Sequence, residues 1–172
     1  MAEPDVRAAT ADDAAQIAAI YAHHVLHGTG TFEIDPPDSD EINRRRLAIE
    51  EHGLPYLVAA RGDRILGYAY AAPYRPRLAY RYTVEDSIYI DPAETGRGLG
   101  KLLLPALVQA CEKAGRRQMI AVIGDSENVP SIKLHERFGF RHTGVLHRVG
   151  FKFGRWLDTV LMQRELNGSG PR

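Results

Sequence analysis

The sequence has few features of a secreted, membrane-spanning or metal-binding protein. Its 172 residues include one cysteine, Cys111, so no disulfide can form within the chain and a cysteine-based zinc site is excluded. It contains no apolar run long enough to cross a bilayer and no segment typical of a signal peptide. We therefore expect a cytoplasmic protein that does not act on a membrane.

The chain also lacks an excess of charge of either sign. Lys+Arg and Asp+Glu are equal at 22 each, so long-range attraction to nucleic acid is not expected. His23, His24 and His27 lie close together, but no acidic partner accompanies them, and we expect no metal site. Hydrophobic residues make up 44% and charged residues 26%, which is typical of one globular domain of this length.

Hydrophobic periodicity and turn residues predict alternating strands and helices. Strands are expected at 6–9, 55–60, 65–72, 82–90 and 118–123 and twice from Phe140 onward, with helices capped by Thr10 and Ser39 and at 99–114 and 128–138. This order predicts a single α/β domain over residues 1–166, with a mixed, mainly antiparallel (α+β-type) sheet flanked by helices and one parallel crossover. The polar tail 167–172 is expected to be disordered.

The strongest local signal is a glycine-containing loop between a strand and a helix, Thr95-Gly96-Arg97-Gly98-Leu99-Gly100-Lys101. Its glycines allow close approach of a ligand to the backbone, and free N–H groups at the helix start attract a diphosphate. Arg97 or Lys101 could add charge-assisted contacts. The spacing fits neither a Walker loop nor a dinucleotide-binding fingerprint, and a plain turn is the alternative.

Several segments together resemble one enzyme family. The loop and Asn128–Phe140 are similar to the two acetyl-CoA-binding segments of the GNAT superfamily of N-acetyltransferases. The closer resemblance is to its phosphinothricin and methionine sulfoximine acetyltransferase branch, carried by Thr83–Glu85, Ala121–Gly124, Leu134–Glu136 and Gly150–Asp158. The similarity runs in the right order from about Val6 to Leu166.

The resemblance implies acetyl-CoA as co-substrate and a set of residues that bind it. These are Ile88, Tyr89, Ile90, Thr95, Gly96, Arg97, Gly98, Leu99, Gly100, Lys101, Asn128 and Ser131. Asn128 has an alternative role as a helix cap. Thr95 stands where the family usually has Gln or Arg. We therefore expect backbone N–H groups to make most of the hydrogen bonds to the pyrophosphate.

The implied reaction is attack of an amine on a thioester, which requires loss of a proton from the ammonium. Glu85 is the candidate general base, with an ion pair to Arg81 as the alternative. His135 stands where many relatives have tyrosine. It is a candidate to protonate the leaving thiolate or to relay the amine's proton, and the alternative is a structural histidine.

The resemblance also implies an acceptor site that binds a small amine of the phosphinothricin, methionine sulfoximine or methionine sulfone type. Arginine pairs with carboxylate and phosphinate oxygens, and the alternative is that Arg75 and Arg77 belong to a solvated charge run. A homodimer is expected from the resemblance alone. The acceptor-binding candidates are Phe32, Arg75, Arg77 and Tyr80.

Two other functions remain open from the sequence. A protein N-terminal or polyamine acetyltransferase would keep the chemistry and change the acceptor. A non-catalytic acetyl-CoA-binding module would keep only the scaffold, and the presence of Glu85 and His135 beside the glycine loop argues against it.

Overall fold

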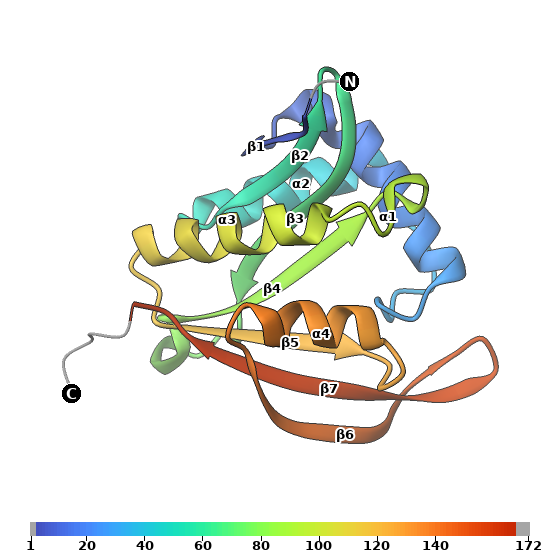
Figure 1. Cartoon of the computed structure of the whole chain (residues 1–172), viewed down its shortest axis with the longest axis vertical. Coiled ribbons are helices and arrows are strands. Elements are labelled where there is room, and N and C mark those ends of the chain that lie inside the picture. The colour runs from blue at the N-terminus through green and yellow to red at the C-terminus, as the bar shows by residue number, and fades with distance from the viewer. Residues whose placement is uncertain (1–2, 168–172) are drawn as a thin grey trace.

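A mixed sheet of seven strands runs through the computed structural model of the protein, which describes residues 3–167 (Figure 1). The strands lie in the order β1-β2-β3-β4-β5-β7-β6, and the pair β4–β5 is parallel while the other pairs are antiparallel. The strands are β1 (Asp5–Ala8), β2 (Tyr56–Arg61), β3 (Arg64–Pro73), β4 (Thr83–Ile90), β5 (Gln118–Gly124), β6 (Arg141–Lys152) and β7 (Arg155–Glu165).

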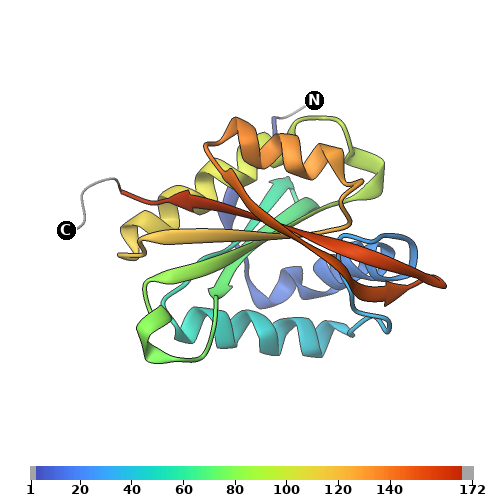
Figure 2. The ribbon, with the colours of Figure 1, turned by 90° about the horizontal axis from the view of Figure 1, so that it is seen from below.

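Helices cover both faces of this sheet. Figure 2 shows α3 and α4 on one face and α1 and α2 on the other. The α-helices are α1 (Ala14–His27), α2 (Ser39–Glu51), α3 (Leu99–Lys113) and α4 (Val129–Arg137), and short 3-10 helices lie at Ala11–Asp13, Leu78–Tyr80 and Pro92–Glu94. The predicted α/β domain with one parallel crossover is confirmed. No helix within residues 3–167 is long and apolar enough to cross a membrane.

The predicted elements are present in the predicted order, and the differences lie at helix ends. Thr10 precedes a 3-10 turn, not α1 directly, because the Asp13 carboxylate accepts the Thr10 N–H at 2.8 Å and closes that turn. Ser39 is the first residue of α2 and not its cap, since the side chain of Asp38 accepts the N–H of Glu41 at 2.8 Å. A carboxylate in this position satisfies one free donor of the first helical turn.

Little of the predicted disordered tail falls within the described residues. Asn167 belongs to them, and its backbone and side-chain nitrogens donate to Glu112 at 3.2 and 3.1 Å. The remainder of the tail, residues 168–172, lies outside the described part of the chain, as do residues 1 and 2.

The apolar face of α3 supplies much of the core. Leu103, Leu104, Leu107 and Cys111 recur at helical spacing and have no exposed surface. Burial raises the pKa of the Cys111 thiol to about 12, which keeps it protonated and unreactive. Cys111 is thus a core residue, as its place on an apolar helix indicates.

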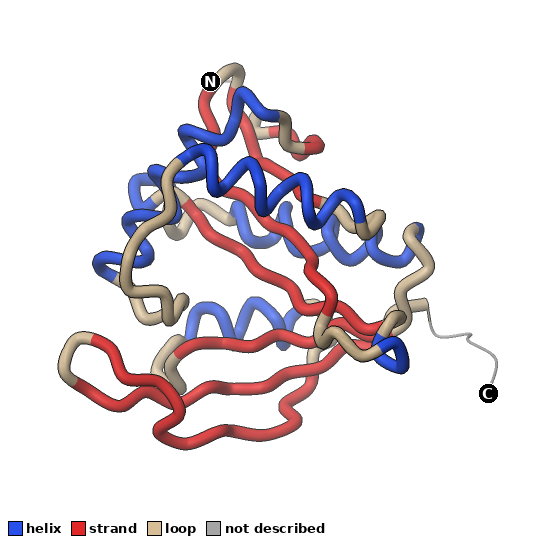
Figure 3. Tube along the Cα trace, turned by 180° about the vertical axis from the view of Figure 1, so that it is seen from behind, coloured by secondary structure: helices blue, strands red, loops and turns tan. Residues whose placement is uncertain are grey.

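The central parallel pair separates along its length. Paired residues of β4 and β5 run from Thr83 opposite Gln118 to Asp86 opposite Ala121, whereas β4 continues to Ile90 and β5 to Gly124. Figure 1 shows the two strands side by side at their starts and diverging toward their ends. On the far edge, β6 and β7 form a long hairpin that extends past the other strands (Figure 3). The separation of β4 from β5 creates the site described next.

Candidate active site

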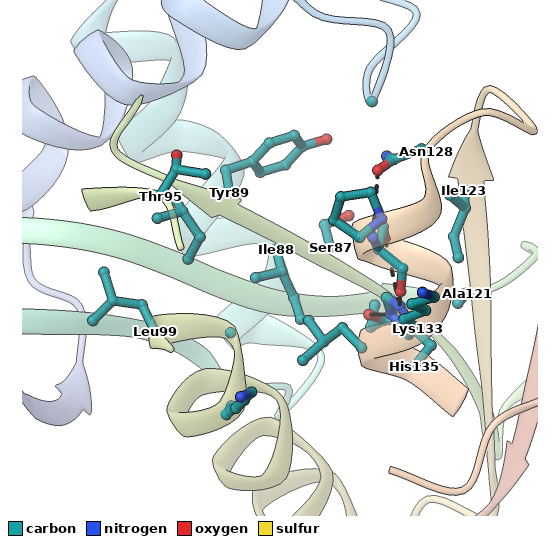
Figure 4. Close-up of a pocket in the computed structure, with 18 of the residues that line it drawn as sticks. Ser87, Ile88, Tyr89, Thr95, Leu99, Ala121, Ile123, Asn128, Lys133 and His135 are labelled. Carbon is teal, nitrogen blue, oxygen red and sulfur yellow. Dashed lines mark hydrogen bonds and ion pairs between the residues drawn. The ribbon is translucent and has the colours of Figure 1, made fainter. Parts of the chain in front are cut away.

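A cleft of about 710 Å³ lies where β4 and β5 separate, between the start of α3 and α4. Figure 4 shows Thr95 and Leu99 on one side of it, Asn128, Lys133 and His135 on the other, and Ile88 between them. With the exception of Arg97, every residue predicted to bind the cofactor lines this cleft. The fold therefore brings together two segments that lie about thirty residues apart in the sequence.

The glycine loop forms one wall through its backbone. Gly96 and Gly98 have φ angles of 80° and 82°, a left-handed region that side-chain-bearing residues rarely adopt. Gly98 is the N-cap of α3, and Leu99 and Gly100 at the start of this helix line the cleft, where helix-start N–H groups carry a partial positive charge. Gly100 has a different reason, because an added Cβ would lie 2.8 Å from Leu134 of α4. These three glycines leave room for an anion where the start of α3 approaches α4.

The two basic residues of the loop are placed differently. Lys101 lines the cleft, as predicted. The Arg97 guanidinium instead lies 3.2 Å from a carboxylate oxygen of Glu94, which is 3% exposed and also 3.3 Å from Arg64. The Arg97 side chain thus stabilises the loop by pairing with Glu94, because a buried carboxylate requires cationic partners.

Asn128 and Ser131 form the start of the opposite wall. The side-chain oxygen of Asn128 accepts the Ser131 N–H at 3.4 Å, so Asn128 does cap α4. Asn128 also lines the cleft. The two roles that the sequence left open are therefore compatible, since the cap uses the oxygen and leaves the amide nitrogen.

His135 is held on both ring nitrogens inside this wall. Nδ1 lies 2.7 Å from the carbonyl oxygen of Ser131, and Nε2 lies 2.8 Å from Oδ2 of Asp86. Burial lowers the pKa of His135, but the hydrogen bond and charge of Asp86, with the Ser131 carbonyl, outweigh it and raise the pKa overall. Since both neighbours are acceptors, the geometry favours an imidazolium with two N–H donors.

This arrangement bears on what His135 can do. An imidazolium has no lone pair with which to take a proton from an amine. Both of its N–H groups already donate to protein acceptors, so donation to a thiolate would require one of these contacts to open. Asp86 contacts His135 through Oδ2. Its other carboxylate oxygen, Oδ1, is buried and has no hydrogen-bond partner within residues 3–167. Asp86 itself is among the residues that line the cleft.

Glu85 lies on the other face of the sheet from Asp86, because successive side chains of a strand alternate. Its cross-strand neighbour is Ala72 of β3, and Tyr89 on the same face contacts Tyr21 of α1 with ring centroids 4.9 Å apart. Burial and then the nearby charge of Asp86 raise the pKa of Glu85, while Arg75 lowers it in part. A carboxylate with a raised pKa beside the strand separation suits a general base.

The alternative ion pair between Glu85 and Arg81 does not form. The Arg81 guanidinium lies over the ring of Tyr82, 4.6 Å from its centroid, and donates to the carbonyl of Leu78. The arginine whose charge acts on Glu85 is Arg75.

The acceptor candidates come from two places. The segment that follows β3 holds Arg75, which lies 5.1 Å from the ring centroid of Tyr74, and Tyr80, which packs edge-on to the same ring. Arg77 is exposed in this segment. Phe32 instead packs against Gly124, at the C-terminal end of β5, and against β6. The structure places the arginine loop before the start of β4 and the aromatic residue at the opposite end of the separated strands.

Two site residues escaped the sequence reasoning. Strand alternation could have indicated Asp86, since a residue next to Glu85 in β4 must face the other side of the sheet. His24 lines the cleft and its Nε2 lies 2.8 Å from the carbonyl oxygen of Ile90, which distant elements bring together. No local pattern reveals a contact of this kind.

Comparison with known proteins agrees with this geometry. Residues 6–161 match the family model described as an acetyltransferase (GNAT) domain. The chain is 56% identical to a phosphinothricin N-acetyltransferase of Alcaligenes faecalis, over 94% of this chain and 82% of that protein. It is 39% identical to an L-methionine sulfoximine/L-methionine sulfone acetyltransferase of Salmonella typhimurium, over 94% of each.

Solved structures give the same result. A phosphinothricin acetyltransferase from Sinorhizobium meliloti in complex with acetyl-CoA superimposes with a TM-score of 0.93 at 44% identity, covering 99% of this chain and 94% of that one. The structure of a Salmonella typhimurium protein with its cofactor acetyl-CoA gives a TM-score of 0.95 at 37% identity, covering 99% of this chain and 98% of that one.

Proposed function

Because the chain belongs to the GNAT superfamily of acetyltransferases, we propose that it transfers acetyl from acetyl-CoA to the α-amine of a small amino-acid-like acceptor. Phosphinothricin, methionine sulfoximine and methionine sulfone are the acceptors that its relatives' names suggest. One observation carries the proposal: a general-base candidate, Glu85, and an anion-binding glycine loop flank the separation of two parallel strands from opposite faces. A reaction between two bound molecules needs such a passage through the sheet.

The cleft residues fit acetyl-CoA. The diphosphate would lie on the N–H groups at the start of α3, with Lys101 adding a positive charge. Asn128 and Ser131 would contact the pantetheine arm along the α4 wall. Bound there, the cofactor supplies an activated acetyl thioester.

Glu85 takes the first proton in this proposal. An alkyl ammonium is charged at neutral pH and becomes a nucleophile only after it loses a proton. Glu85 accepts that proton directly or through a water molecule. The raised pKa of its carboxyl lies closer to the pKa of the acceptor's ammonium, which makes the transfer easier. Backbone N–H groups near Tyr89 and Ile90, beyond the last β4–β5 pair, stabilise the negative charge that develops on the carbonyl oxygen.

His135 completes the proton balance on the other face. The departing thiolate gains a proton, and an imidazolium held by Asp86 and the Ser131 carbonyl is a suitable donor. The hydrogen bond and charge of Asp86 raise the pKa of His135 and so favour its protonated form. The two catalytic candidates thus act on opposite sides of the sheet, one on the amine and one on the thiolate.

Arginines select the acceptor. Arg75 and Arg77 offer forked donors to the carboxylate or phosphinate oxygens of an amino-acid-like molecule. A polyamine acceptor would meet positive charge in this segment, so cationic amines are disfavoured.

A thiol-release assay with purified protein tests the proposal. Acceptors would include phosphinothricin, methionine sulfoximine, methionine sulfone, a polyamine and a peptide with a free N-terminus, with products identified by mass spectrometry. We expect acetylation of the first three and little of the last two. Tight acetyl-CoA binding without thiol release from any amine would show a non-catalytic module instead.

The same proposal includes a homodimer in the cytoplasm. Apolar side chains stand exposed on the β6–β7 hairpin, among them Phe151 at 57% and Trp156 at 62%, whose rings lie 5.1 Å apart. Such a patch marks a protein interface, and a free cysteine suits a reducing compartment. Analytical ultracentrifugation should give a dimer that Trp156→Glu weakens, and a monomeric native protein would refute the dimer.

A further inference from the structure

A buried lysine on the hairpin holds the segment that carries Phe32. Lys152, near the end of β6, is 3% exposed, and its ammonium donates to the carbonyl oxygens of Gly28 and Thr31 at 2.8 and 2.9 Å. These carbonyls lie more than a hundred residues away in the sequence, in the segment that follows α1. We propose that Lys152 is a positioning residue that fixes segment 28–32 and thereby sets Phe32 as a wall of the acceptor pocket. This inference rests on the proposed function.

The hairpin and the end of β5 are shaped to receive this segment. An added Cβ on Gly124 would overlap the carbonyl oxygen of Thr29, and one on Gly150 would overlap the ring of Phe32. In addition, the Thr29 hydroxyl donates to Asp125 at 3.2 Å. Segment 28–32 thus packs against Gly124 and Gly150, and the Lys152 ammonium binds its Gly28 and Thr31 carbonyls.

Segment 28–32 connects the two halves of the site. Gly30 lines the cofactor cleft, where an added Cβ would lie 3.9 Å from the side-chain nitrogen of Asn128. Two residues later, Phe32 leaves the cleft and packs against β6, with 37% of its surface exposed. A shift of this segment would therefore move Phe32, the predicted aromatic wall of the acceptor pocket, and Gly30 in the cofactor wall.

The chemistry explains why a lysine serves here. Burial of an ammonium is unfavourable unless its N–H donors find acceptors, and two backbone carbonyls with the Phe153 ring at 5.0 Å provide them. Hydrogen bonds from charged donors are stronger than neutral ones. A methionine fills a similar volume but donates nothing, so it would leave two carbonyls without partners and release the segment.

Lys152→Met tests this role, with Lys113→Met on the exposed end of α3 as the matched control. We expect Lys152→Met to raise the acceptor KM about tenfold while the acetyl-CoA Kd changes less than about twofold. Lys113→Met should change neither. A merely structural role would lower the melting temperature and the active fraction and leave the acceptor KM unchanged.

A double-mutant cycle identifies the route of the effect. If Lys152 acts through Phe32, adding Lys152→Met to Phe32→Ala should cost far less kcat/KM than it costs the native enzyme. Additive losses would overturn the proposal. If Lys152→Met does not fold, Lys152→Gln takes its place in the cycle. Its neutral N–H donors form weaker hydrogen bonds than the ammonium, so we expect a smaller loss of kcat/KM that is again non-additive with Phe32→Ala.

A second readout does not depend on turnover. Amide hydrogen exchange over residues 28–32, followed by mass spectrometry, should accelerate in Lys152→Met and stay unchanged in Lys113→Met. Unchanged exchange together with an unchanged KM would refute the role of Lys152 even in an active enzyme. If the native enzyme acetylates no amino-acid-like acceptor, the proposed function fails, whereas the exchange result still decides whether Lys152 holds the segment.

Discussion

Oδ2 of Asp86 lies 2.8 Å from Nε2 of His135, and the two residues are 6% and 4% exposed. The contact joins β4 to α4, and both residues line the cofactor cleft. Because the Ser131 carbonyl occupies the other ring nitrogen, this pair determines the protonation state of His135. It also joins the sheet to the helix that forms one wall of the site.

The pair gives the protein a pH-dependent stability. The pKa of His135 is raised on folding, so protonation stabilises the fold below the ordinary value of 6.5, and this contribution disappears as the pH rises through the raised pKa. We expect His135→Gln to lower the free energy of unfolding most near pH 6 and least near pH 9, measured by urea denaturation. The exposed His142→Gln is the control, and a loss that does not vary with pH would contradict the raised pKa.

Asp86→Asn should impair turnover more than cofactor binding. The amide cannot supply the negative charge that keeps His135 protonated, so its pKa should fall and the proton donor should be lost at neutral pH. We expect kcat to drop by about tenfold or more, with an acetyl-CoA Kd within about twofold of native. Full activity at pH 8 in the variant would show that His135 need not carry a proton.

Glu85→Gln should reduce kcat by about 10²–10⁴, since it removes a general base, and leave acetyl-CoA affinity nearly unchanged. Steady-state kinetics and calorimetry measure the two quantities. Glu51→Gln, an exposed residue at the end of α2, is the matched control. Native turnover in Glu85→Gln would mean that another group accepts the proton.

Substitutions of Arg75 and Arg77 should have different effects on the pH dependence of kcat/KM. The acid limb of kcat/KM should lie above 4.5, the ordinary pKa of the Glu85 carboxyl, because burial raises it. The charge of Arg75 lowers that pKa, so Arg75→Gln should move the limb to higher pH, whereas Arg77→Gln should leave it in place. Both variants should raise KM for anionic acceptors. Equal limbs in the two variants would refute the electrostatic link between Arg75 and Glu85.

Gly98→Ala tests the glycine loop. Its φ of 82° should cost about 1–2 kcal/mol of stability with a side chain present, and relief of that strain would distort the start of α3. Gly62→Ala, at φ 58° in the β2–β3 turn, should be strained similarly but lie away from the cleft. We expect both variants to lower the melting temperature and Gly98→Ala alone to weaken acetyl-CoA binding. Equal cofactor affinities would show that the loop conformation is not required.

The sequence by itself determined the order of the elements, the glycine loop and the identity of the family. The elements and the loop follow from local physics, because apolar periodicity and glycine at special φ angles act within a few residues of the chain, whereas the family was indicated by resemblance to known sequences. The expectation that Arg97 faces the ligand was weaker, since a side chain's direction depends on partners such as Glu94.

Only the tertiary structure decided which residues share a site. The buried contact of Asp86 with His135 and the two carbonyls on Lys152 join residues that lie 49 and more than 120 positions apart. Such contacts arise when the sheet fixes which elements become neighbours, and no local pattern encodes them. The separation of β4 from β5 is likewise a property of the whole sheet, and the proposed site depends on it.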